Sequence, residues 1–273
     1  IADGAIDVAH MSANSIDSAQ YVDGSIDTAH IANDAVTADK LADSINTAIA
    51  TGPAALSRSG GTLTGNIVLG TNTISGLQIT TTATSNIGLG ANAVNSITTG
   101  DYNVGLGDEA GTAITTGATN TAIGNSALQA NTTGSDNTSV GGYALATNTT
   151  ASNNTAIGRQ AMQLNTTGTE NVGLGYQSVK ANTTGTGNTG LGYRTLETVI
   201  TGTDNTAVGG YALLVNTGSN NTAVGYRSLD ANTTASNITA VGKDSLGANT
   251  TGADNAALGM QSLRDNTTGA SNV

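Results

Sequence analysis

Residues 221–237 read Asn-Thr-Ala-Val-Gly-Tyr-Arg-Ser-Leu-Asp-Ala-Asn-Thr-Thr-Ala-Ser-Asn, and close copies of this stretch follow one another along most of the chain. An Asn opens each copy at a spacing of 17 residues, with a single spacing of 16. These asparagines are Asn86, Asn103, Asn120, Asn137, Asn154, Asn171, Asn188, Asn205, Asn221, Asn255 and Asn272, and Ile238 takes the one missing place. A fixed period of this length is the signature of a repeat architecture.

Each copy carries two aliphatic places separated by a glycine. The glycine stands four residues after the opening Asn and is always preceded by Leu, Ile or Val. The second aliphatic place lies four residues after the glycine, from Val94 to Leu263, and is broken only by Gly111. Two short aliphatic stretches followed by a polar Asn-Thr-Thr-Gly turn are typical of one coil of a parallel β-solenoid or β-roll. The sequence therefore predicts an all-β repeat fold, a β-roll shaft, over residues 86–273.

The invariant residues of the repeat indicate how the coils stack. Asparagines in the same place of every coil are expected to form a hydrogen-bonded ladder along the axis. A glycine in the same place is expected at a backbone corner that needs a positive φ or close contact with the next coil. The two aliphatic side chains of a coil offer little burial against the entropy of ordering 17 residues. We therefore expect parallel copies of the chain to associate into an elongated fibre, most simply a homotrimer.

Residues 1–50 follow a different repeat of ten residues, in which an apolar residue falls at every fifth position, as at Ile6, Met11 and Ile16. A spacing of five fits neither one face of a helix nor one face of a strand. We expect a thin stalk with short helical turns, whose apolar residues meet those of parallel chains and which ends in a short helix over residues 41–50. A flexible acidic linker and a single-chain pentapeptide solenoid remain as alternatives.

Residues 51–85 are expected to form a β-rich joint, because short aliphatic stretches alternate there with glycines. Within it, Ser59-Gly-Gly-Thr-Leu-Thr-Gly-Asn-Ile67 resembles a segment of bacteriophage tail-fibre proteins. The repeats resemble a second group: residues 120–128 and 221–229 are similar to the head repeats of trimeric autotransporter adhesins, and the Asn-Thr-Thr-Gly stretches are similar to repeats of phage tail fibres.

These resemblances imply a structural component of a viral tail fibre. The chain would form a trimeric shaft in the virion tail, outside the cell, and would present a distal tip that recognises the host. Its partners would be two further copies of itself, other tail or baseplate proteins at the N-terminal side, and a host surface glycan or protein. The alternative is a bacterial trimeric surface adhesin whose repeat face binds a host ligand.

The composition disfavours several other classes of function. The net charge of −11 disfavours binding to nucleic acid, and no run of 18 apolar residues is present to insert into a membrane. An enzyme is not expected, because Asp108-Glu109 is the one adjacent acidic pair and the glycines are repeat corners rather than phosphate loops. The adjacent threonines of the turns differ from the alternating Thr-x-Thr of ice-binding faces.

No metal or cofactor is expected either. His10 and His30 occupy the same place of the ten-residue repeat, where a trimer would bring three copies of each near the axis, but solvated histidines are the preferred interpretation. Asp7, Asp17 and Asp27 are interpreted as helix-capping residues rather than as a calcium ladder, because the glycine-rich calcium nonapeptide is absent.

Aromatic and cationic residues that follow the coil glycine are the candidate ligand contacts. Exposed tyrosines next to arginines are suited to stacking on a sugar or contacting a receptor, and packing between neighbouring coils is an equal alternative. The candidate receptor-contact residues are Tyr176, Tyr193, Arg194, Tyr226 and Arg227. Tyr143 and Tyr211 stand one residue further from the glycine.

Overall fold

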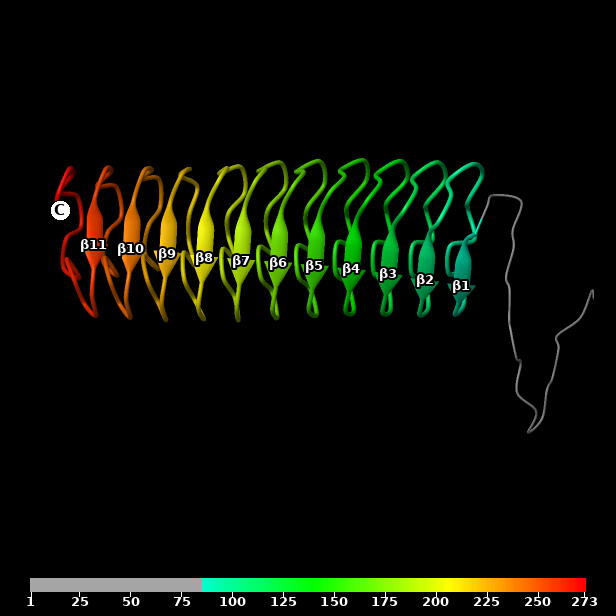
Figure 1. Ribbon diagram of the computed structural model, residues 1–273, viewed down its shortest axis with the longest axis horizontal. Coiled ribbons are helices and arrows are strands. Elements are labelled where there is room, and N and C mark those ends of the chain that lie inside the picture. Colours follow the sequence, from blue (N-terminus) through cyan, green and yellow to red (C-terminus); the bar gives the residue numbers. More distant parts are fainter. Residues whose placement is uncertain (1–84) are drawn as a thin grey trace, which may run out of the picture. The chain divides into compact units, whose positions relative to one another are not determined.

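The computed structural model describes residues 85–273, which form a parallel β-solenoid (Figure 1). Within this range the chain forms one eleven-stranded sheet, its strands are all parallel and neighbours in sequence order, and it contains no helix. The strands are β1 (Ile87–Leu89), β2 (Val104–Leu106), β3 (Thr121–Ile123), β4 (Thr138–Val140), β5 (Thr155–Ile157), β6 (Val172–Leu174), β7 (Thr189–Leu191), β8 (Thr206–Val208), β9 (Thr222–Val224), β10 (Thr239–Val241) and β11 (Ala256–Leu258). The predicted β-solenoid of 17-residue coils is confirmed.

The other sequence-based predictions of fold concern residues that the structure does not describe. The stalk over residues 1–50, its short helix over residues 41–50, and the joint over residues 51–85 except for its last residue lie outside the described residues. His10, His30 and the capping aspartates belong to the same part of the chain.

The register of the sheet explains the fixed period. Thr121 of β3 pairs with Thr138 of β4, and Thr138 pairs with Thr155 of β5, so that the same place of the repeat lies above itself in each coil. Parallel strands hydrogen-bond at a spacing of about 4.8 Å, and each coil therefore advances the chain by one strand width.

The glycine that follows each strand, here called the corner glycine, is required for two reasons at once. Its φ lies between +114° and +133° in all eleven corners of the described solenoid, a region that side-chain-bearing residues rarely adopt. A Cβ atom on the corner glycine Gly141 would also lie 2.6 Å from the carbonyl carbon of Gly158 in the next coil. The sequence predicted either a positive φ or close contact with the next coil at this glycine, and the structure shows both.

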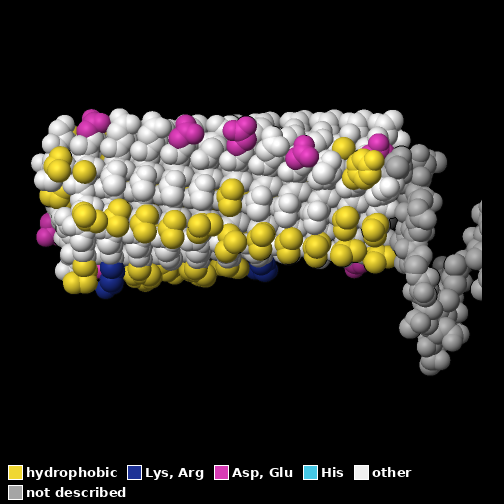
Figure 2. Space-filling model, viewed as in Figure 1, with side chains coloured by type: hydrophobic (Ala, Val, Ile, Leu, Met, Phe, Trp, Pro, Cys, Tyr) yellow, Lys and Arg dark blue, Asp and Glu magenta, His cyan; other side chains and the backbone are white. Residues whose placement is uncertain are grey.

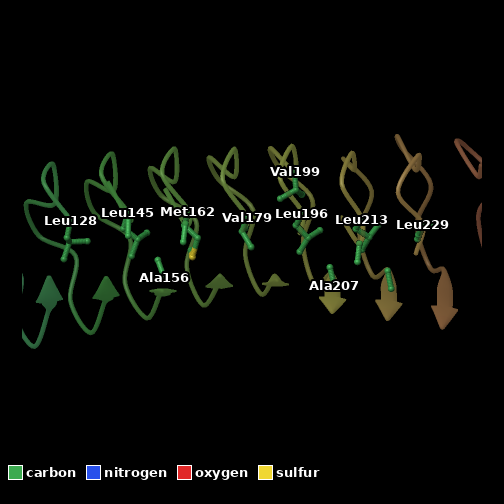
Figure 3. Packing of buried hydrophobic residues seen from close by; sticks show 14 of the residues in the cluster. Leu128, Leu145, Ala156, Met162, Val179, Leu196, Val199, Ala207, Leu213 and Leu229 are labelled. Atoms are coloured by element: carbon green, nitrogen blue, oxygen red, sulfur yellow. The ribbon is translucent and has the colours of Figure 1, made fainter. Parts of the chain in front are cut away.

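The core of the solenoid is a single file of aliphatic side chains (Figure 3). Its members, here called the inner aliphatics, lie four residues after the corner glycines; Leu128, Leu145 and Met162 are fully buried examples. The middle residue of the strand faces them and is small, as at Ala156 and Ala207. The residue before the inner aliphatic is also small and, in most coils, buried, as at Ala127 and Ala144. In most coils the apolar interior is thus filled by one medium-sized side chain and small ones, which accounts for a sequence with only 3% aromatic residues.

The inner aliphatics adopt left-handed backbone conformations, with φ from +41° to +54°. This region costs an L-residue roughly 1–2 kcal/mol, a cost that burial of the aliphatic side chain offsets. At the one place where the inner aliphatic is replaced, Gly111 has a φ of +61°, and the Cδ1 atom of Ile114 lies 2.8 Å from where a Cβ atom of Gly111 would be. Ile114 therefore fills the space that Gly111 leaves.

The Asn that opens each repeat, here called the lead asparagine, forms the predicted ladder. Asn120 donates from its backbone N and from Nδ2 to Oδ1 of Asn103, both at 3.0 Å. Its Nδ2 atom also donates to the carbonyl of Gly134, 14 residues further along the same coil, at 2.9 Å. Wherever the lead asparagine is present, one buried side chain thus links its coil to a neighbouring coil and closes its own coil within a single chain; the coil that opens with Ile238 lacks this side chain.

A second asparagine ladder was not predicted. The Asn of the Asn-Thr-Thr-Gly stretch, here called the second asparagine, is buried rather than solvated; Asn148 donates from Nδ2 to Oδ1 of Asn131 at 2.9 Å and to the carbonyl of Ala151 at 3.0 Å. Ile97 and Ile114 take this place in the first two coils, and Val199 takes it in a later one. As a result Oδ1 of Asn182, in the coil before, is the single buried side-chain polar atom without a partner among the described residues.

Replacement of neighbouring glycines tests the corner geometry. We expect Gly141→Ala to lower the free energy of unfolding by several kcal/mol, since both its φ of +128° and the backbone of Gly158 oppose a side chain. Gly142→Ala is the matched control, because its Cβ atom would meet nothing closer than 3.9 Å. Urea unfolding followed by circular dichroism measures both variants, and equal losses at the two positions would contradict the assignment.

Repair of the second ladder gives a stabilising prediction. Val199→Asn supplies a donor to Oδ1 of Asn182, an unsatisfied buried atom that costs about 1–3 kcal/mol. The variant is expected to unfold at higher temperature than the parent chain in scanning calorimetry, whereas Val199→Ala, which only removes volume, is expected to unfold at lower temperature. A Val199→Asn variant as unstable as Val199→Ala would refute the assignment.

Candidate functional site

One face of the solenoid carries a row of aliphatic side chains that point outward. These are the residues directly before the corner glycines, here called the outer aliphatics: Leu89, Leu106, Ile123, Val140, Ile157, Leu174, Leu191, Val208, Val224, Val241 and Leu258. Leu89 is 52% exposed and Leu174 is 47% exposed. Figure 2 shows hydrophobic side chains in a row that runs across the strands. Of the two aliphatic places of a coil, only the inner one therefore belongs to the core.

The alternation of side chains along a strand explains the outward direction of the row. The middle residue of each three-residue strand points inward, so the first and third residues point out. The first residue is mostly Thr and the third is the outer aliphatic, and none of the described strands contains a charged residue. The strand face is therefore uncharged along its whole described length.

A second surface feature is a row of four tyrosines from consecutive coils, Tyr176, Tyr193, Tyr211 and Tyr226, here called the tyrosine row. Tyr176 and Tyr193 stack with ring centroids 5.4 Å apart and an interplanar angle of 16°. Tyr193 meets Tyr211 at 5.2 Å and Tyr211 meets Tyr226 at 5.9 Å, both edge to face. The tyrosines therefore pack against one another and still remain open to solvent, since Tyr193 is 46% and Tyr226 49% exposed.

The ring of Tyr226 packs against Gly210 of the preceding coil, which has no side chain in its way. Tyr211 stands one residue later in its coil than the other three, after Gly209 and Gly210. A Cβ atom on Gly210 would lie 3.6 Å from Cδ2 of Tyr226, so the ring of Tyr226 lies over the backbone of Gly210. Tyr143 also follows two glycines, and it has no aromatic contact among the described residues.

Two arginines beside the row are each paired with a carboxylate three residues later. Nε of Arg194 contacts Oε2 of Glu197 at 2.5 Å, and Nε of Arg227 contacts Oδ2 of Asp230 at 2.7 Å. The hydrogen bond with the carboxylate raises the pKa of each guanidinium, so both arginines keep their charge. The guanidinium carbon of Arg194 also lies 5.6 Å from the ring centroid of Tyr211, within cation–π range.

The surroundings of Tyr193 keep its hydroxyl group protonated. Desolvation in the row raises the pKa of the Tyr193 phenol, and its hydrogen bond with Tyr211 acts in the same direction. The hydroxyl is therefore a neutral donor and acceptor at physiological pH.

A hollow of about 280 Å³ lies at the end of the tyrosine row. Its lining consists of Tyr211, Leu214, Tyr226, Arg227 and Asp230, from the two coils that carry β8 and β9. The surface combines two aromatic rings, one aliphatic side chain and one ion pair, which are the components of a small-ligand subsite.

Of the predicted contact residues, the structure brings Tyr176, Tyr193 and Arg194 together in one part of the row and Tyr226 and Arg227 at its end. Tyr211 joins the two parts but was not among the contact residues predicted from the sequence. Glu197, Asp230 and Leu214 were not predicted either. The spacing of Arg and acid by three residues was a signal for the ion pairs; Leu214 gave none.

The acidic pair considered for catalysis has a structural role in the coil stack. Oδ1 of Asp108 accepts a hydrogen bond from the backbone N of Ala91 at 3.0 Å. Oε2 of Glu109 accepts one from Nε2 of Gln129 at 2.7 Å, and also accepts one from the hydroxyl of Ser126. Asp108 thus contacts the preceding coil, and Glu109 contacts the following coil.

Within residues 85–273 no group of three or more His, Cys, Asp or Glu residues is placed to hold a metal ion. None of the described residues belongs to a helix that could cross a membrane. Comparison of the chain with protein-family models, curated proteins and solved structures finds no match.

Proposed function

We propose that the chain is a structural component of a viral tail fibre, a shaft in which three parallel copies associate through their strand faces. The observation that carries this proposal is the row of outer aliphatics, which runs without a charge across all the described strands. The function of the shaft would be mechanical, because it would hold a distal host-recognition tip away from the particle.

The strand face has the features of a contact surface between copies. Contiguous exposed apolar surface beyond a few hundred Å² marks an interaction site on a soluble protein, and eleven rungs at about 4.8 Å extend this row to roughly 50 Å. Because each chain closes its own coils, association need not exchange strands between copies. Parallel copies related by a closed cyclic axis would bring identical rungs to the same height.

The number of copies and the viral setting rest on the sequence. The repeats and the segment of residues 59–67 resemble those of trimeric fibre proteins. In this setting the shaft lies in the virion tail, outside the cell, and its N-terminal side joins other tail or baseplate proteins. The solenoid supports the mechanical role, since each coil is hydrogen-bonded to the next through both backbone and asparagine ladders.

A bacterial trimeric surface adhesin is the second candidate, and the exposed tyrosine row favours it. In that case the repeat face itself would bind a host ligand, and Tyr176, Tyr193, Arg194, Tyr226 and Arg227 would supply the contacts. The strand face would have the same role in both candidates.

Charge on the strand face tests the association. We expect the chain to have the mass of three copies in native mass spectrometry, and the variant Ile157→Asp with Leu174→Asp to have the mass of one copy, because carboxylates would be buried without partners. The matched control is Leu164→Asp. Leu164 is 41% exposed, comparable to the 37% of Ile157 and the 47% of Leu174, but it lies outside the strands.

A parent chain of monomeric mass would exclude the trimeric shaft. Loss of association in Leu164→Asp as well would show that the strand face is not the contact surface. Circular dichroism of each variant separates loss of association from unfolding of the solenoid.

A further inference from the structure

We propose that the hollow at the end of the tyrosine row binds a neutral oligosaccharide. This site is separate from the strand face that carries the proposed shaft. It adds Tyr211, Leu214 and Asp230 to the residues that the sequence suggested, and it specifies the chemistry of the ligand.

The geometry of the two aromatic rings fits a sugar ring. Tyr211 and Tyr226 stand at an interplanar angle of 88°, with centroids 5.9 Å apart, and both line the hollow. Two perpendicular rings form the walls of a corner, and the apolar C–H groups of a pyranose pack against such walls. The hollow of about 280 Å³ has room for one sugar ring with its hydroxyl groups.

The polar part of the hollow supplies hydrogen bonds for sugar hydroxyls. The carboxylate of Asp230 accepts and the guanidinium of Arg227 donates, and both groups are planar, so that each can engage neighbouring hydroxyls of one ring. Their mutual contact uses Nε of Arg227, and the terminal nitrogens of this side chain have no hydrogen-bond partner among the described residues. The Arg227 side chain is 55% exposed.

Charge balance favours a neutral ligand over an acidic one. Arg227 is neutralised by Asp230, and Arg194 is neutralised by Glu197. Because each cation is already paired, a carboxylate or sulfate on the ligand would gain little from either and would meet the repulsion of the neighbouring acid.

The spacing of the row favours a saccharide chain over an extended peptide. Successive tyrosine rings lie 5.2–5.9 Å apart, close to the length of one pyranose unit. A polyproline helix, the usual peptide ligand of aromatic rows, repeats every three residues of 3.1 Å, or roughly 9 Å, which does not match. An oligosaccharide seated between Tyr226 and Tyr211 can therefore continue along the exposed edge of the tyrosine row.

The test uses the full chain on a microarray of neutral, sialylated and uronic-acid oligosaccharides, followed by titration calorimetry with the strongest neutral binder. We expect binding to neutral oligosaccharides and a Kd at least tenfold higher for Tyr226→Ala. Tyr226→Phe keeps the ring and is expected to retain the parent Kd within about threefold. The matched control is Tyr143→Ala, because Tyr143 is 40% exposed, follows two glycines as Tyr211 does and lies outside the row.

Several outcomes would overturn the proposal. They are the absence of any neutral binder on the array, binding only to acidic glycans, binding of a proline-rich peptide in place of sugars, and an equal loss in Tyr143→Ala. Native mass spectrometry of Tyr226→Ala separates this site from the shaft. An unchanged mass with weakened sugar binding supports a ligand site, whereas a changed mass would assign the tyrosine row to contacts between copies.

Discussion

The structure depends on one constraint: each coil lies one strand spacing, about 4.8 Å, from the previous coil, so that the same place of the repeat stacks on itself. At this spacing only a few residue types can repeat in the interior. An asparagine can, because Oδ1 of Asn103 accepts from Asn120 while Nδ2 of Asn120 also closes its own coil on Gly134. The corner place can repeat only as glycine, because the Cβ atom of any other residue would meet the backbone of the next corner.

The same constraint determines how much the sequence could predict. The period, the lead asparagine ladder and the corner glycines follow directly from residues that recur in one place, and all three are confirmed. The direction of each aliphatic side chain does not follow, because Leu174 and Leu196 recur equally regularly, yet one is 47% exposed and the other is fully buried. Leu174 is the outward-pointing third residue of a strand, whereas Leu196 lies at a left-handed backbone position inside the coil, and no local propensity of leucine indicates either placement.

The candidate site was only partly predictable for a related reason. A repeated residue shows its role by recurring, whereas the hollow is built from departures from the repeat. Tyr211 stands one residue later than Tyr226 does in the next coil, and Gly210 takes the place that Tyr193 and Tyr226 occupy in theirs. Such departures have no periodic signal, and only the stacking of the coils shows that these residues meet. The proposed ligand site is thus built at the places of the repeat that the stack leaves free to vary.

The single spacing of 16 residues shows where the stack tolerates change. The coil that begins at Asn205 lacks one residue in its turn, yet Thr206 still pairs with Thr222 and the backbone N of Asn221 still donates to Oδ1 of Asn205 at 3.1 Å. The second ladder also continues, since Asn232 donates to Asn216 at 2.7 Å. The missing residue is absorbed where the chain faces solvent, between the two asparagine columns. The two asparagine ladders therefore set the register of the coils, and the turn between them can lose a residue without shifting it.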